Sequence, residues 1–300
     1  MLTLVRVVVT VAMLGIVPLG LGLVGGRGVE ALRRVWLGPA FVAAAAQWLP
    51  RGAFTAALAV PYLALTAALA AVALTRAWTY VAARPLAPYA PQNAGLGSVS
   101  RQRTVGAGQR WVVEVAVWTA LATPVVGALA LVAERAGVRL FGFRLSILAL
   151  TVAHFHVAGF AAALVAGLVA RATAAGALGT TAALCVPGGT LLVLLGFFVG
   201  DEVELAGAAV LTAGMWAAGW LTWRDVRPHS PDRVTRGLLA VSSAVLAATM
   251  VLALSWALGE ATGLPHLSIT WMAATHGVTN ALGFALCAVL AWRRLGARPL

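Results

Sequence analysis

The chain has 300 residues, of which 61% are hydrophobic and only 10% are charged. Soluble domains carry roughly a quarter charged residues, so this composition excludes a soluble protein or a soluble domain on a membrane anchor. The formal net charge of +12 comes from 21 arginines with no lysine, and because these lie singly or in small groups between apolar runs, we expect the lipid bilayer as the partner and no nucleic acid.

Apolar segments follow one another along the whole chain. A helix needs about 20 apolar residues to cross the hydrocarbon of a bilayer, and arginines, prolines and polar clusters separate the segments. The pattern predicts nine spans, at residues 3–24, 35–49, 52–75, 111–133, 145–170, 175–199, 205–223, 237–258 and 270–292. We therefore expect an all-α fold, a polytopic transmembrane helix bundle that forms a single integral membrane domain over residues 1–300.

The first two segments leave the number of spans open between nine and eight. The second provides only fifteen residues, about 22 Å of helix against a hydrocarbon core of about 30 Å. It is therefore a tilted crossing or a re-entrant segment that turns near Pro50. The first segment contains Arg6 and is alternatively a cleaved signal peptide, although it lacks a strong basic region and a clear cleavage site.

Arginine placement predicts the orientation of the chain. With nine spans, sixteen arginines fall on the side of the C-terminus, whereas Arg51, Arg135, Arg139 and Arg144 fall on the other side. Cytoplasmic loops are the arginine-rich ones, so we expect the N-terminus outside and the C-terminus in the cytoplasm. The longest hydrophilic stretch, residues 76–110, is then a cytoplasmic loop.

Three histidines lie in the middle of predicted spans, where polar groups are costly and therefore functional candidates. His154 and His156 are in the fifth span, and His276 is in the ninth with Asn280 one turn further on. At about 1.5 Å per residue, all three histidines fall within about 8 Å of a common depth. The i, i+2 spacing turns His154 and His156 about 200° apart, so we expect one to face His276 and the other a different neighbour.

These residues predict a shared polar site. We expect one fifth-span histidine to come within direct or one-water hydrogen-bond reach of His276 or Asn280, because isolated imidazoles in hydrocarbon would be unpaired. Thr151 and Thr279 would complete the cluster. Neutral imidazoles also bind transition metals and haem iron, so His154, His156 and His276 are candidate metal ligands. The alternative is that the histidines are packing residues that form hydrogen bonds between helices.

Carboxylates are few and lie toward the ends of the spans. Glu114 is near the cytoplasmic start of the fourth span, where it is expected to be an interfacial or helix-start carboxylate. Asp201, Glu202 and Glu204 form an acidic cluster in an outer loop. This outer acidic loop is either a solvated turn or a mouth that collects cations.

Two segments of the sequence carry a resemblance. They read A-H-F-H-V-A-G-F at 153–160 and T-H-G-V-T-N-A-L-G-F at 275–284, and with them the chain resembles the YndJ-like family of bacterial multipass membrane proteins. The resemblance implies the bacterial inner (plasma) membrane and a site at His154, His156, His276 and Asn280, without implying an activity. The string His-Phe-His is also similar to the pair that ligates two haems in haem-copper oxidases, whose other histidine-bearing helices are missing from this chain.

Three functions are compatible with these features. The first is a metal or haem protein that uses the histidines as ligands. The second is a transporter or proton-coupled permease, entered through the acidic loop. The third is an intramembrane enzyme acting on a lipid or isoprenoid, with a histidine or Glu114 as general acid and Trp216 and Trp220 lining an apolar pocket. The sequence leaves the activity and the oligomeric state open.

Overall fold

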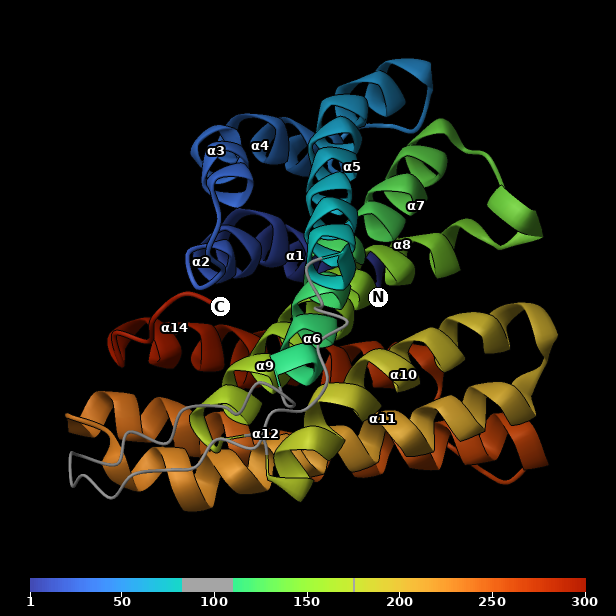
Figure 1. Ribbon diagram of the computed structural model, residues 1–300. Coiled ribbons are helices and arrows are strands. Elements are labelled where there is room, and N and C mark those ends of the chain that lie inside the picture. The colour runs from blue at the N-terminus through green and yellow to red at the C-terminus, as the bar shows by residue number, and fades with distance from the viewer. Residues whose placement is uncertain (83–109, 175) are drawn as a thin grey trace, which may run out of the picture.

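The structure, a computed structural model, describes residues 1–82, 110–174 and 176–300 (Figure 1). Every regular element in these ranges is a helix, which confirms the all-α prediction. Of the predicted cytoplasmic loop at 76–110, residues 76–82 belong to a helix and 83–109 lie outside the described residues.

The described part of the chain has eight helical segments that are long and apolar enough to cross a membrane. Several are divided by kinks or π-helical turns. They are α1 (Leu2–Val11) with η1 (Ala12–Ile16) and α2 (Val17–Leu21); α5 (Ala53–Ala82); α6 (Arg110–Ala122) with α7 (Pro124–Ala136); α8 (Leu145–His154) with η4 (Phe155–Ala161) and α9 (Ala162–Ala172); α10 (Ala177–Val199); α11 (Asp201–Leu221) with η5 (Thr222–Val226) and η6 (Arg227–His229); α12 (Arg233–Thr262); and α13 (Ile269–Met272) with η7 (Ala273–Gly277), η8 (Asn280–Leu286) and α14 (Cys287–Arg294). A short 3-10 turn, η3 (Leu140–Gly142), connects α7 to α8.

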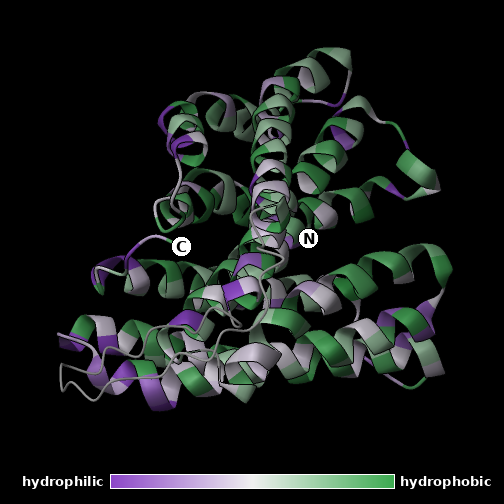
Figure 2. Cartoon of the chain, in the orientation of Figure 1, coloured by the Kyte–Doolittle hydropathy of each residue, from purple (hydrophilic) through white to green (hydrophobic). Residues whose placement is uncertain are grey.

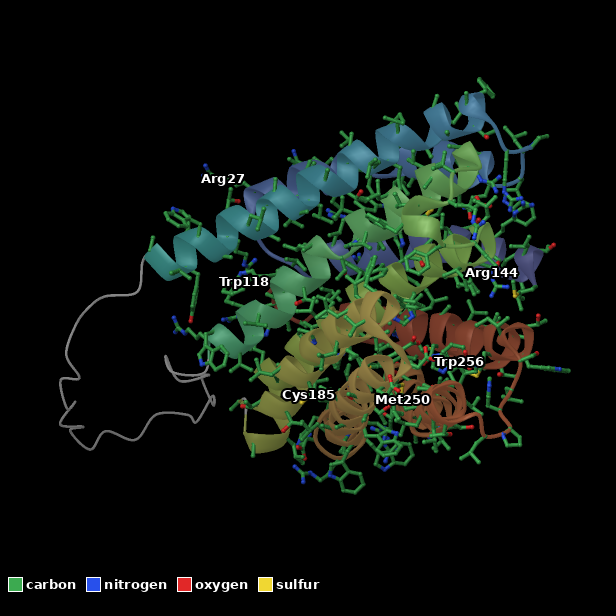
Figure 3. The ribbon with its side chains drawn as sticks, turned by 90° about the vertical axis from the view of Figure 1, so that its right-hand side faces the viewer. Arg27, Trp118, Arg144, Cys185, Met250 and Trp256 are labelled. Atoms are coloured by element: carbon green, nitrogen blue, oxygen red, sulfur yellow. The ribbon has the colours of Figure 1, made fainter. Side chains whose placement is uncertain are left out.

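Two groups of contacts define the opposite ends of the bundle. At the end that we call the Met1 end, the Thr270 hydroxyl lies 3.6 Å from the Met1 sulfur. At the Leu300 end, Gly25 N donates to Leu300 O at 2.7 Å. The side chains of Arg27 and Arg144 lie toward opposite ends in Figure 3. Figure 2 shows that the hydrophilic residues gather mainly near the ends of the helices, as a bilayer requires.

The predicted second span differs most from the structure. Its apolar part is only the ten-residue helix α4 (Leu37–Ala46), about 15 Å long. The charged helix α3 (Arg27–Val35) precedes it. Together they run from the Leu300 end, beside Gly25, to the Met1 end, where the Arg6 guanidinium lies over the Trp48 ring. The described helices therefore pass through the bundle nine times, and this odd number agrees with Met1 and Leu300 lying at opposite ends.

Two contacts stabilise this short passage. The Glu30 carboxylate pairs with Arg33 at 2.9 Å and with Arg34 at 3.3 Å within α3, which lowers the cost of placing charges there. Where α3 meets α4, the fully buried Trp36 donates its indole N–H to Met13 O at 2.8 Å. This bond joins the passage to the first helix, so the segment is held by the bundle rather than by its own apolar length.

Helices α10 and α11 form a tight antiparallel pair along one side of the bundle (Figure 1). Glycines allow this approach: a β-carbon at Gly189 would collide with backbone atoms of Leu211, and one at Gly207 would collide with the backbone of Val193. Small residues of this kind let membrane helices approach closely. The pair can therefore pack backbone to backbone.

Replacing Gly189 with Ala is expected to destabilise the fold by about 1–3 kcal/mol, because the clash is with a backbone that cannot rotate away. Thermal unfolding in detergent would measure this loss. The matched control is Gly188→Ala, since a β-carbon at Gly188 meets nothing within 4 Å and alanine favours the helix by up to about 1 kcal/mol. Equal melting temperatures for the two variants would contradict the close approach.

Candidate histidine site

All three intramembrane histidines lie at or beside π-helical turns. His154 is the last residue of α8, and His156 belongs to η4. His276 lies in η7, and Asn280 begins η8. Such turns shift the direction of side chains and are frequent at functional sites. Segments η4 and η8 pack against each other, so the fifth and ninth predicted spans are neighbours.

His156 is fully buried, and both of its ring nitrogens have partners. Its Nδ1–H donates to Val152 O at 2.7 Å. This leaves Nε2 of the neutral ring as an acceptor, and Tyr62 Oη of helix α5 lies 2.6 Å away and donates to it. Because no lone pair is left over, His156 joins η4 to α5 as a packing residue.

The residues around His156 pack closely against its ring. A β-carbon at Gly127 of α7 would lie 2.8 Å from ring atom Cε1 of His156, so glycine is needed where the imidazole passes. The His156 ring stacks on Tyr62 with their centroids 5.8 Å apart, and Tyr62 meets Trp36 edge to face at 5.5 Å. This aromatic row links α3–α4, α5 and η4.

His154, unlike His156, has a ring nitrogen without a hydrogen-bond partner in the described part of the chain. Its Nε2 is buried and has no hydrogen-bond partner among the described residues. The ring meets Phe155 edge to face, with the centroids 5.8 Å apart, and it lies within electrostatic reach of His276. No hydrogen bond joins His154 to His276 or to Asn280 in the described residues. An unpaired buried imidazole nitrogen costs about 1–3 kcal/mol, so His154 Nε2 is a candidate functional group.

His276 belongs to a polar contact between the last helix and α12. Its Nδ1–H donates to Thr249 O at 2.9 Å. Asn280 extends the contact, because its Nδ2 donates to His276 O at 2.9 Å and its Oδ1 accepts from the Thr249 hydroxyl at 3.0 Å. The bond through Nδ1 orients the ring and leaves a lone pair on Nε2 of neutral His276.

The two threonines that were expected to complete the cluster bond elsewhere. Thr151 Oγ1 donates to Ile147 O at 2.9 Å, and Thr279 Oγ1 donates to Thr275 O at 2.5 Å, each within its own helix. The structure therefore places His154 within electrostatic reach of His276 and pairs His156 with Tyr62; a shared site of His154, His276 and Asn280 stays a prediction. Thr151 and Thr279 flank this arrangement without bonding to the histidines.

The three histidines do not come together as a metal centre in the described residues. No three His, Cys, Asp or Glu side chains within those ranges come together in a way that could hold a metal ion. His156 uses both nitrogens in other bonds. A metal or haem at His154 and His276 stays a prediction.

Glu114 is held at the Leu300 end of the bundle by an ion pair. Arg76 of α5 binds both of its carboxylate oxygens, at 2.7 and 2.8 Å. The same guanidinium donates to Gly25 O at 3.1 Å. Through Arg76, Glu114 thus connects α6 to α5 and to the segment before α3, and its role as an interfacial carboxylate stays a prediction.

The acidic cluster lies in a helix and not in a loop. Asp201, Glu202 and Glu204 occupy the first turn of α11, where carboxylates are favoured by the unpaired N–H groups and by the helix dipole. The prediction of an acidic loop is wrong in this respect. Glu204 also lies within electrostatic reach of Glu260, the residue that pairs with His266 at 3.2 Å.

Sequence reasoning missed Tyr62 and Thr249, the partners of the histidines. Both are neutral residues inside long apolar helices, and both also occur widely as ordinary packing residues. For Tyr62 one signal exists: it directly follows Pro61 within a span, where an aromatic hydroxyl needs a partner. Nothing local in the sequence distinguishes Thr249 from the other threonines of α12.

The long apolar helices, with their charges at the two ends, define a multipass helical membrane protein. A family profile described as YndJ-like protein matches residues 7–284. The chain therefore belongs to the YndJ-like family. No curated protein and no solved structure matches it significantly.

Proposed function

We propose that this protein is a proton-coupled permease in which His154 and His276 bind and release the coupling proton. The observation that supports this best is the state of His154 Nε2, which is buried without a partner. Histidine is the side chain whose charge changes most readily near neutral pH. An imidazole with an unused nitrogen inside the membrane is suited to accept a proton.

The second imidazole allows a relay. His276 keeps a lone pair on Nε2 because its Nδ1–H is used by Thr249, and it lies within electrostatic reach of His154. A positive charge on one ring disfavours a charge on the other, so the pair takes up one proton at a time. Transfer of that proton from one histidine to the other would move a positive charge between the two helices, and this would change how the helices pack.

The charges at the Met1 end support a route by which protons reach His154 and His276. We propose that this end faces the outside of the bacterial inner membrane, because most arginines lie toward the other end. The first turn of α11 and Glu260 then form an acidic entrance in which cations and protons are concentrated. The Leu300 end differs, since Arg76 and Glu114 neutralise each other there.

A transition metal or haem held by His154 and His276 is the second candidate. It is favoured by two imidazoles on neighbouring helices that each retain an unbonded nitrogen. Structural zinc takes four ligands and haem iron takes axial ligands from its two faces, so further donors would have to come from the ligand or from water. Stoichiometric metal or a Soret band in the purified protein would favour this candidate over the permease.

The permease predicts that His154→Gln removes proton flux. Glutamine preserves polarity but does not titrate, so flux should fall by about 100-fold, the range for loss of a positioned proton carrier. The measurement uses proteoliposomes loaded with a pH-sensitive dye, in which a potassium diffusion potential drives proton entry. His276→Gln should have the same effect.

The control is His229→Gln. His229 is an exposed residue after α11, where its ring donates to Asp225 O at 2.8 Å, so its loss should leave flux unchanged. Wild-type vesicles no faster than empty ones would contradict the proposal, as would a His154→Gln flux equal to that of the wild type.

A further inference from the structure

The tryptophans of α11 line a groove that is separate from the histidine site. Trp216, Trp220 and Trp223 are spaced at i, i+4 and i+7, which places them on one face of α11 and of the turn after it. Together with Gly219 and with residues 243, 244, 246 and 247 of α12, they line an open groove of about 510 Å³. This volume lies within the ~300–1,000 Å³ that is typical of ligand sites.

One polar residue of the groove wall has a hydroxyl without a partner in the described residues. Ser243 lines the groove and is only 7% exposed, and its hydroxyl makes no hydrogen bond in the described residues. A buried hydroxyl without a partner is costly. A serine in a membrane helix usually donates to its own backbone or to another helix. The Ser243 Oγ atom is itself buried, so it would reach a ligand in the groove by rotating about the Cα–Cβ bond.

A positive charge lies at one end of the groove. The Arg227 guanidinium stacks over the Trp223 ring, 3.9 Å from its centroid. Among the described residues it forms no ion pair with a carboxylate, whereas Arg224 is bound to Asp225 at 2.7 Å. The Arg227 Nε donates to Trp223 O at 3.4 Å, which leaves the two Nη groups for other partners. Guanidinium groups bind phosphate through two parallel hydrogen bonds, so these groups could bind an anion at the mouth of the groove.

We propose that the groove binds one anionic phospholipid, with an acyl chain against the three tryptophans and the phosphate at Arg227. The Ser243 hydroxyl then donates to an ester carbonyl of the lipid. The apolar wall, the unpaired hydroxyl and the terminal arginine match the three chemical parts of such a molecule in order. The groove contains no carboxylate or imidazole, so this site binds the lipid without reacting with it.

The test uses delipidated protein in detergent, titrated with phosphatidylglycerol or with phosphatidylcholine of the same acyl chains and observed by native mass spectrometry. One phosphatidylglycerol should bind at least tenfold more tightly than phosphatidylcholine. Ala247→Phe, which fills the groove from an exposed position, should weaken phosphatidylglycerol at least tenfold. Arg227→Gln should abolish the preference between the two lipids.

The matched control is Ala248→Phe, because Ala248 is the next residue, is also exposed and does not line the groove. It should bind lipid as the wild type does. Equal binding of the two lipids, or equal effects of the two phenylalanines, would overturn the proposal. So would a wild-type dimer that Ala247→Phe converts to a monomer, because the occupant would then be a second copy of the chain.

Discussion

Replacing Arg135 with Met is expected to lower the free energy of unfolding by about 3–5 kcal/mol, the range for removing one partner of a buried ion pair. Arg135 is 1% exposed and binds both carboxylate oxygens of Glu134. The variant would leave Glu134 with only the half-exposed Arg51 as its counter-charge. Thermal unfolding in detergent and denaturant titration would both detect a loss of this size.

Arg135 also closes the end of the short passage through the bundle. Its Nη1 lies 3.1–3.3 Å from the carbonyl oxygens of Ala46, Gln47 and Leu49. The last carbonyls of a helix have no partner within it, and here the guanidinium provides one. Helix α4 is ten residues long, so we expect the loss of Arg135 to loosen this helix before the others.

Two further variants separate charge from geometry. Arg135→Lys keeps the charge but cannot form the planar fork, so it should fall between the wild type and Arg135→Met. Arg139→Met removes an exposed arginine whose only described bond is to Gly142 O, and it should change stability by less than about 0.5 kcal/mol. A similar loss in Arg139→Met and Arg135→Met would show that burial of Arg135 contributes nothing.

The spans were predictable because each long helix is a long apolar run with charges at its ends. Eight of the nine predicted segments correspond to the long helices, with ends that differ by a few residues; α5 extends furthest beyond its prediction, to Ala82. The exception was α3–α4. Its charged half reads as a loop in the sequence, and its position depends on bonds such as Trp36 to Met13 O, which no local pattern reveals.

The directions of the two fifth-span histidines were also predictable, whereas their partners were not. Residues two apart on a helix point to different sides, and His154 and His156 have different neighbours here, His276 and Tyr62. Tyr62 lies 94 positions from His156, and the pairing arises from tertiary packing of α5 against η4. The acidic cluster was misplaced because three carboxylates within four residues resemble a loop in sequence, whereas they form the first turn of α11.

The Tyr62–His156 pair gives the last prediction. Tyr62→Phe should destabilise the protein by about 1–3 kcal/mol, because it leaves Nε2 of a fully buried imidazole unpaired. His156→Leu should cost about 2–4 kcal/mol, since it leaves the buried Tyr62 hydroxyl without an acceptor and removes packed ring atoms. Thermal unfolding of both single variants and the double variant would complete a double-mutant cycle.

The double variant should lose less free energy of unfolding than the sum of the two single variants, with a coupling of about 1–2 kcal/mol. The reason is that it removes both polar groups and so leaves neither one buried without a partner. Proton flux per folded molecule should stay near that of the wild type in Tyr62→Phe, since the proposed relay runs through His154 and His276. A Tyr62→Phe variant that unfolds normally but loses flux would reverse this assignment. His156 would then belong to the proton path, and the aromatic row from Trp36 to His156 would be part of the working site.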